Sequence, residues 1–163
     1  MQSKRLEYRK FDYDDFDDLT EIMSNPNVCE YIPGDPSYSK EVIEKWLNHF
    51  IRTFNDEHGT RLFAILEQGK SKVIGYGGIG YVKEFDQMEI MYVLNESVWG
   101  KGYASEASLY FKELAKEQGL TMLIGLAHID NIASQKVLLK TGYKKLKQIY
   151  IWGLECFYYE MNL

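Results

Sequence analysis

The spacing of hydrophobic residues changes several times along the chain, and each change marks a predicted element. Residues 6–12 alternate in the manner of a strand, and residues 12–25 then place apolar side chains at helical spacing. Residues 39–54 repeat the helical pattern, with Ser39 as a possible N-cap. The chain is therefore expected to open with one strand and two helices.

The middle of the chain has the pattern of strands. Residues 61–68, 72–82 and 87–95 are three strand-like runs separated by polar turns, which predicts an antiparallel meander. Residues 102–119 then have one apolar face at helical spacing, and Gly119 ends this predicted helix.

The C-terminal part adds a buried strand at 121–128, a short helix at 131–142 and two strands at 143–152 and 155–163. The complete order is β-α-α-β-β-β-α-β-α-β-β, which predicts an α/β fold with a mixed sheet. A length of 163 residues suits one domain that spans residues 1–163.

One stretch interrupts this regular pattern. All three prolines lie within residues 24–39, which we expect to form a loop. A loop of that length suggests a lid or a binding wall. The sequence does not decide whether the part from 27 to 39 closes over a site.

Composition excludes several classes of protein. The net charge of −5 is not typical of proteins that bind nucleic acid, which carry an excess of positive charge. Cys29 and Cys156 have no Cys or His at metal-ligand spacing, so we expect no metal site and no disulfide framework. The start of the chain has no signal-peptide core, and no apolar run is long enough to cross a membrane. We therefore expect a cytoplasmic protein with reduced thiols and no membrane partner.

The densest run of glycines is not predicted to bind phosphate. Residues 75–80 match G-x-G-x-x-G, the fingerprint of dinucleotide-binding proteins. That fingerprint needs a helix directly after it, because phosphate binds at a helix N-terminus. A turn and another strand follow instead, so we interpret these glycines as strand positions where bulk would intrude.

A second glycine pair has the context that the first one lacks. Residues 95–107 read NESVWGKGYASEA, in which a strand runs into a loop that opens directly into a helix. Unpaired N–H groups from Gly100 to Ala104 can converge there on a pyrophosphate, and Lys101 adds a positive charge. The alternative is an ordinary turn that needs glycine for its dihedral angles.

The start of the next helix carries a pair of polar residues. Asn131 and Ser134 are three positions apart and so share one helix face. They follow a buried strand, at the end where ligands bind in open α/β sheets. The alternative is a capping pair, with Asp130 or Asn131 as the N-cap and Ser134 in the first turn.

Taken together, WGKGYASEA and NIASQKVLLKTGY resemble the GNAT N-acetyltransferase superfamily. The likeness is strongest to the branch that contains the ribosomal-protein N-terminal alanine acetyltransferases. Trp99 stands where the family's acyl-CoA loop often has Gln or Arg, and Gly102 and Ala104 match that loop. The family's later motif, N-x-x-S-x-x-(hydrophobic)₃-K-x-G-(F/Y), is matched by the following residues: Asn131, Ser134, Lys140, Gly142 and Tyr143.

The resemblance implies that acetyl-CoA is the acetyl donor and lies between two splayed strands. Main-chain groups of Met91, Val93 and Leu94 would hold pantetheine and the acetyl carbonyl. Asn131 would bond the pantetheine arm, and Ser134 would lie near the sulfur. The pyrophosphate loop would consist of these residues: Trp99, Gly100, Lys101, Gly102, Tyr103 and Ala104.

The implied chemistry is direct attack of an amine on a thioester, which needs a base and an acid. Glu89 is the candidate base, because it stands on the same side of its strand as Met91 and Val93. Ser134 is the candidate acid for the thiolate, ahead of Tyr103 and Tyr143.

Several alternatives stay open. The same fold could serve as a non-catalytic acyl-CoA sensor, and the loop at Gly100 and Gly102 could serve a nucleotide-binding protein. The acceptor could be a protein N-terminus, a polyamine, an aminoglycoside or a small metabolite. The three histidines show no triad partner at fixed spacing, and a monomer and a homodimer fit equally well.

Overall fold

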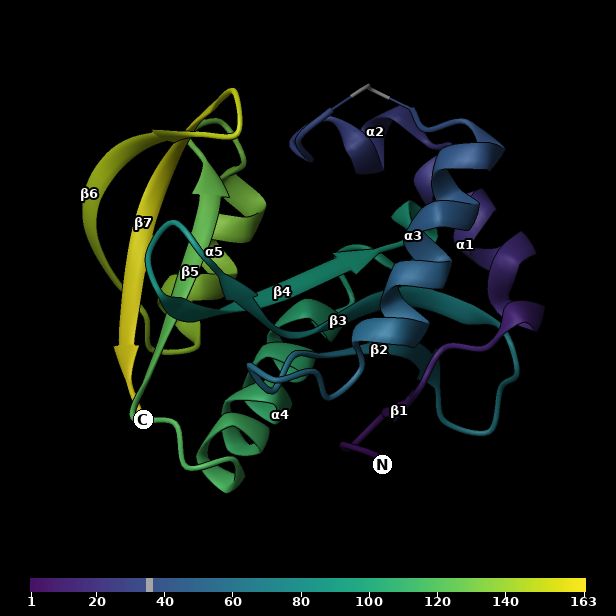
Figure 1. The fold of residues 1–163 in the computed structure, drawn as a ribbon, viewed down its shortest axis with the longest axis horizontal. Coiled ribbons are helices and arrows are strands. Elements are labelled where there is room, and N and C mark those ends of the chain that lie inside the picture. The colour runs from purple at the N-terminus through teal and green to yellow at the C-terminus, as the bar shows by residue number, and fades with distance from the viewer. Residues whose placement is uncertain (35–36) are drawn as a thin grey trace.

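A computed structural model describes residues 1–34 and 37–163 and shows a single twisted sheet of seven strands (Figure 1). The strands in chain order are β1 (Leu6–Arg9), β2 (Arg61–Glu67), β3 (Val73–Val82), β4 (Gln87–Leu94), β5 (Met122–His128), β6 (Lys144–Ile151) and β7 (Leu154–Asn162). Their order across the sheet is β1-β2-β3-β4-β5-β7-β6. Among these neighbours β4 and β5 run parallel, and the other pairs are antiparallel.

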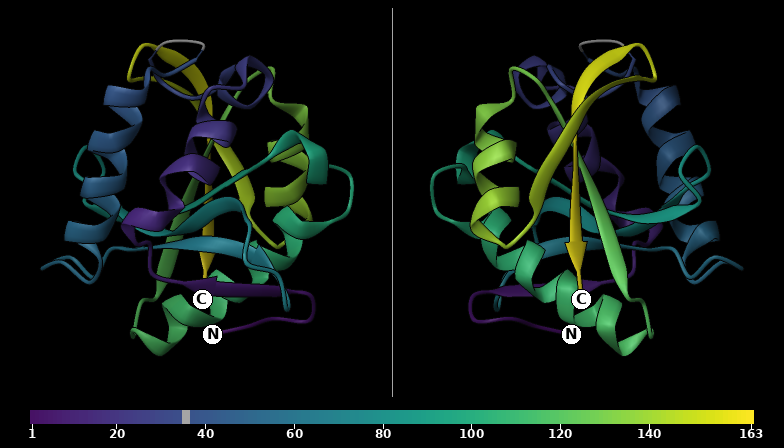
Figure 2. Two further views of the ribbon diagram at one scale, coloured as in Figure 1. Left: turned by 90° about the vertical axis from the view of Figure 1, so that its right-hand side faces the viewer. Right: turned by 90° about the vertical axis from the view of Figure 1, so that its left-hand side faces the viewer.

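Helices cover both faces of the sheet (Figure 2). The first face carries α1 (Phe16–Met23), α2 (Pro26–Cys29) and α3 (Lys40–Thr53), and the second carries α4 (Tyr103–Glu117) and α5 (Ile132–Lys140). Two 3₁₀ turns, η1 (Tyr13–Asp15) and η2 (Glu96–Val98), precede α1 and follow β4. The α/β class with a mixed sheet is confirmed.

The predicted loop at 24–39 is wrong in one part, because Pro26–Cys29 forms the short helix α2. Asn25 caps this helix, since its side chain accepts a hydrogen bond from the Asn27 N–H at 2.9 Å. Pro26 suits the first helical position, where a missing N–H costs nothing. Residues 35 and 36 of the stretch lie outside the described part of the chain.

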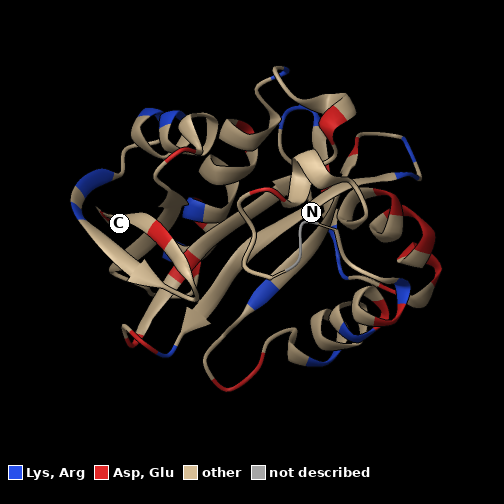
Figure 3. Ribbon diagram, turned by 90° about the horizontal axis from the view of Figure 1, so that it is seen from above, with Lys and Arg blue, Asp and Glu red and all other residues tan. Residues whose placement is uncertain are grey.

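Each face of the sheet has its own apolar core. The core between the sheet and α4 includes the fully buried residues Phe63, Phe111 and Leu123. The core between the sheet and the helices α1 and α3 includes Leu19, Ile43 and Leu47. Asp17 and Asp18 lie in the first turn of α1, and acidic residues gather along that helix (Figure 3). Amphipathic spacing thus assigned each helix a buried side, and the sheet separates the two cores.

The glycines of residues 75–80 belong to β3, the strand between β2 and β4. A Cβ added to Gly75 would lie 2.3 Å from the carbonyl oxygen of Val93, and one added to Gly77 would lie 2.6 Å from that of Met91. Both separations are too short for a side chain. The glycines therefore allow β3 to lie against the backbone of β4, which confirms the strand interpretation.

Candidate functional site

The sheet opens between β4 and β5. Within the described residues the two strands pair at one position, Glu89 with Ile124, near their N-terminal ends. Two residues further along β5, Leu126 donates its N–H to a carboxylate oxygen of Glu89 at 3.2 Å rather than to the main chain of β4. The strands therefore diverge toward their C-terminal ends and leave a gap that widens beyond Glu89.

Glu89 lies at the narrow end of this gap and is 6% exposed. Burial raises the pKa of its carboxyl to about 8, and the hydrogen bond from the Leu126 N–H opposes that shift. Its β4 neighbours Met91 and Val93 pack on the α1–α3 face together with Tyr76. Glu89 is thus a buried carboxyl group that can exchange a proton near neutral pH.

The register of β3 and β4 decides which main-chain groups of β4 enter the gap. Asn95 donates its N–H to the Ile74 carbonyl at 2.8 Å, and hydrogen-bonded pairs alternate along an antiparallel ladder. Met91 and Val93 therefore direct their N–H and C=O groups toward β3. The groups that face β5 belong to Ile90, Tyr92 and Leu94. Of the three residues expected to offer main-chain contacts, Leu94 therefore directs its main-chain groups into the gap, and Met91 and Val93 direct theirs toward β3.

The loop between η2 and α4 offers a row of unused donors. Gly100 and Gly102 adopt left-handed φ angles of 75° and 78°, which other residues reach only with strain. Across the described chain, the N–H groups of residues 100–105 meet no hydrogen-bond acceptor, and the next N–H, of Glu106, bonds to the Gly102 carbonyl. Successive free N–H groups at the start of a fifteen-residue helix are groups of the kind that can bind an anion.

The other loop residues have distinct positions. The Trp99 indole donates to the Leu94 carbonyl at 2.8 Å and so closes the loop onto the end of β4. Tyr103 is buried and donates its hydroxyl to Glu67 at 2.6 Å, and Ala104 packs against the core. Lys101 is exposed. Only the glycines and the free N–H groups, therefore, point to a ligand.

At the start of α5, Asn131 is the N-cap, and its side-chain oxygen accepts from the Ser134 N–H at 3.0 Å. The capping alternative is thus realised for the oxygen of Asn131. The Ser134 hydroxyl lies 3.1 Å from the Tyr92 hydroxyl, and Tyr92 also donates to the Ser134 carbonyl at 3.2 Å. Burial raises the pKa of Tyr92.

Tyr92 could not be predicted as a partner of Ser134, because β4 and α5 are far apart in the chain and no short-range pattern joins them. Tyr143 was ranked behind Ser134 as the candidate acid. Tyr143 is 2% exposed, and its hydroxyl has no hydrogen-bond partner in the described chain. Burial raises its pKa, with further contributions from Tyr92 and Glu89 nearby.

This geometry can be compared with known proteins. The family model of the acetyltransferase (GNAT) domain matches residues 5–144 of this chain. The chain belongs to the GNAT acetyltransferase family. It is 30% identical over 148 residues to an uncharacterized N-acetyltransferase, YnaD, of Bacillus subtilis strain 168, which covers 89% of this chain and 82% of that protein.

Solved structures of GNAT proteins share the fold. A GNAT-family acetyltransferase from Bacillus anthracis superposes with a TM-score of 0.84 and 25% identity, over 99% of this chain and 97% of that one. RimL, a ribosomal L7/L12 α-N-protein acetyltransferase in complex with coenzyme A, gives a TM-score of 0.81 over 99% and 96%. At 19% identity, the latter likeness shows the fold alone.

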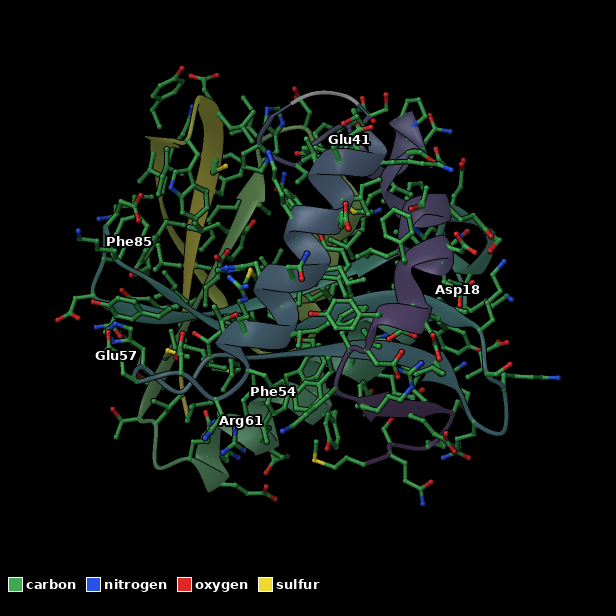
Figure 4. The ribbon with its side chains drawn as sticks, turned by 45° about the vertical axis from the view of Figure 1, so that its right-hand side comes forward. Asp18, Glu41, Phe54, Glu57, Arg61 and Phe85 are labelled. Atoms are coloured by element: carbon green, nitrogen blue, oxygen red, sulfur yellow. The ribbon has the colours of Figure 1, made fainter. Side chains whose placement is uncertain are left out.

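GNAT proteins use acyl-CoA and transfer its acyl group to an amine. On the α1–α3 face, the Tyr31 ring beyond α2 stacks on the His128 ring at the end of β5, with centroids 5.0 Å apart. Phe85, which Figure 4 labels, lies in the turn between β3 and β4 and packs edge-on against Tyr158 of β7, with ring centroids 5.1 Å apart. The Tyr31 stack thus lies at the C-terminal end of β5, whereas the Phe85 contact lies near the paired end of the two strands, where Ile124 is buried with Tyr158.

Other features of the domain lie apart from the gap. Two surface hollows, of about 460 and 230 Å³, lie beside β1 and at the N-terminal ends of β4 and β5. Among the residues that the structure places, no group of His, Cys, Asp and Glu could hold a metal ion. No helix in the same residues is long and apolar enough to span a membrane.

Proposed function

We propose that this GNAT protein transfers an acetyl group from acetyl-CoA to a primary amine by direct attack. The observation that carries the proposal is the row of free N–H groups at residues 100–105 beside a gap in the sheet. A diphosphate group suits the row of free N–H groups, and an extended thioester arm suits the gap. The proposal makes this chain one domain with one reaction centre.

The donor would be held in three places. The pyrophosphate would bind the N–H groups from Gly100 to Ala104, with Lys101 nearby. The pantetheine arm would enter the gap along main-chain groups of Tyr92 and Leu94, and the amide nitrogen of Asn131 would bond it, because its oxygen already caps α5. A main-chain N–H of β4 would stabilise the oxyanion as the amine attacks.

The proton steps would use Glu89, Ser134 and Tyr92. The amine nitrogen bonds to the carbonyl carbon, the carbon–sulfur bond breaks, and the nitrogen loses a proton. Glu89 would accept that proton, since its pKa of about 8 lies near the operating pH. The Ser134 hydroxyl, in contact with Tyr92, would donate a hydrogen bond to the departing thiolate, and the proton that the thiolate finally takes would come through this hydroxyl from solvent water, which restores the hydroxyl.

The acceptor would approach between the α2 segment and β5, past Tyr31 and His128. RimL acts on the N-terminus of a ribosomal protein, and a protein N-terminus is one acceptor that this geometry admits. A small primary amine is the other, because both supply the same nucleophile.

The test is amine-dependent release of coenzyme A. The protein is mixed with acetyl-CoA and each member of a panel of peptides, polyamines, aminoglycosides and amino acids, and free thiol is measured. We expect release that depends on at least one amine. Tight binding of acetyl-CoA with no release for any amine would favour the sensor alternative. Tight binding of ADP that coenzyme A cannot displace would favour a nucleotide-binding protein.

A further inference from the structure

Arg5, the residue just before β1, lies against the candidate anion loop. Its Nη1 donates to the Lys101 carbonyl at 2.9 Å, and its Nε pairs with the Glu106 carboxylate at 2.7 Å. The guanidinium carbon also stands 4.6 Å from the centre of the Tyr103 ring. Three contacts therefore fix one guanidinium group to three residues of a single loop and helix start.

Glu106 anchors this arrangement to the start of the chain. Its carboxylate accepts the Ser3 hydroxyl at 2.7 Å and the Arg5 N–H at 2.6 Å, in addition to the Arg5 Nε. Its side chain is 14% exposed, whereas that of Arg5 is 44% exposed. The half-buried carboxylate thus holds the guanidinium in place, and the guanidinium neutralises a negative charge that would otherwise stand in the first turn of α4.

The bond to Lys101 has a consequence for the next peptide group. A trans peptide is planar, so its C=O and N–H point in opposite directions, and the chain has no cis peptide among its described residues. Arg5 holds the Lys101 carbonyl on its own side of the loop. The Gly102 N–H must therefore point to the opposite side, and it meets no acceptor there within the described chain.

We propose that Arg5 is a positioning residue for the phosphates of the acyl donor. It fixes the Lys101–Gly102 peptide so that the Gly102 N–H faces the anion, and it cancels the charge of Glu106 beside that anion. This inference rests on the proposed function, because it assumes that the loop binds a phosphorylated acyl donor. It adds a residue that stands nearly a hundred positions before the loop.

The first experiment measures coenzyme A binding by calorimetry for the wild type, Arg5→Gln and Arg5→Lys. We expect Arg5→Gln to weaken binding roughly 10-fold or more, as the loss of a charge-assisted hydrogen bond does. Arg5→Lys keeps the charge but cannot bond Lys101 and Glu106 together, so it should also weaken binding, to a smaller extent. Arg9→Gln is the matched control, because Arg9 lies at the other end of β1 and pairs with Asp15 of η1 at 2.5 Å.

The second experiment separates phosphate positioning from a general loosening of the fold. Turnover of acetyl-CoA is compared with turnover of S-acetylpantetheine, which carries no phosphate. Arg5→Gln should raise KM for acetyl-CoA with little change in kcat, and should leave kcat/KM for S-acetylpantetheine near the wild-type value.

Two results would overturn the inference: a change in coenzyme A affinity below twofold in folded Arg5→Gln, or an equal loss for both donors. If wild-type protein bound no coenzyme A, the proposed function itself would fail.

Discussion

Burial of Glu89 affects both the chemistry and the stability of the chain. The folded pKa of about 8 lies well above the value near 4.3 of an unfolded glutamate. Between these two values the folded state keeps a proton that the unfolded state has lost. The free energy of unfolding therefore falls as the pH rises through this range, by at most about 1.4 kcal/mol per pH unit. A carboxyl group kept at such a cost is a candidate for function.

Replacement of Glu89 by glutamine tests both effects. Activity should fall by roughly 10²–10⁴-fold if Glu89 is the base. The melting temperature should exceed that of the wild type by a margin that grows from pH 5 to pH 8, because glutamine does not titrate. In the wild type, kcat/KM should rise with pH and level off above about 8, measured with an acceptor whose own amine pKa is well below that value.

Glu113→Gln is the control for this substitution, because Glu113 lies on the exposed side of α4 in an ion pair with Lys116. A fall in activity of less than about threefold in Glu89→Gln would assign Glu89 a structural role and leave water as the base.

The contact between Ser134 and Tyr92 predicts that their effects on rate depend on each other. Ser134→Ala should lower kcat roughly 10–100-fold, as loss of a hydrogen bond to a charged group does. Tyr92→Phe should lower kcat roughly 3–10-fold in the wild type. In Ser134→Ala it should have almost no effect on kcat, because the Ser134 hydroxyl through which Tyr92 acts is then absent. The measurement is a double-mutant cycle on kcat.

Tyr159→Phe is the matched control for that cycle, since Tyr159 is fully buried and its hydroxyl faces Gln135, one residue along α5. Equal effects of Tyr92→Phe on kcat with and without the Ser134 hydroxyl would show that Tyr92 does not act through Ser134. A loss of about 1 kcal/mol in unfolding free energy for Ser134→Ala with unchanged kcat would leave the hydroxyl only a packing role.

At the scale of elements, the decisive junction is the one from β4 through η2 to α4. Asn95 caps η2 and donates from its amide to Glu21 of α1 at 3.0 Å. Glu96 accepts one amide hydrogen bond each from Asn25 and Asn27, both at 2.9 Å. The loop that precedes α4 is therefore fastened at its start to α1 and α2, while its glycines leave its N–H groups unpaired.

Gly102→Val tests the loop as an element. Valine at a φ of 78° is strained, and its Cβ would lie 3.7 Å from a guanidinium nitrogen of Arg5, so the loop backbone that presents the free N–H groups would have to change. We expect coenzyme A binding to weaken at least 10-fold, as measured by calorimetry. Gly119→Val is the matched control, because Gly119 has a φ of 77° and open space at the other end of α4. Equal affinities in the two variants would remove the loop from the binding site.

At the scale of the whole molecule, the sheet is two parts that meet along β4 and β5. The strands β1–β4 form one antiparallel part and β5–β7 the other, and the recorded pair that joins them is Glu89 with Ile124. Contacts on the α1–α3 side hold the parts together, among them the Tyr31–His128 stack and a hydrogen bond of 2.7 Å from the Trp152 indole to Glu84. The gap is thus fixed at its narrow end and bordered at its wide end.

The sequence by itself determined the order of the elements and the place of the helix start at Gly102. Strand alternation and helical spacing depend on near neighbours, so they could be predicted from short windows. The same holds for the rejection of the glycine run in β3, whereas the sequence left both Asp130 and Asn131 open as the N-cap of α5 and the structure shows Asn131. The four-residue helix α2 was missed, because a segment that begins with Pro26 and is only four residues long shows no periodicity.

Only the tertiary structure decided which residues meet at the site. Arg5 reaches Lys101, and Tyr92 reaches Ser134, across separations in the chain that no local pattern records. The register of β3 against β4 directs the main-chain groups of Met91 and Val93 toward β3, since a shift of one residue reverses the direction of every N–H group. The burial that gives Glu89 its raised pKa comes from packing on both sides of the gap, and such packing exists only once the two parts of the sheet have met.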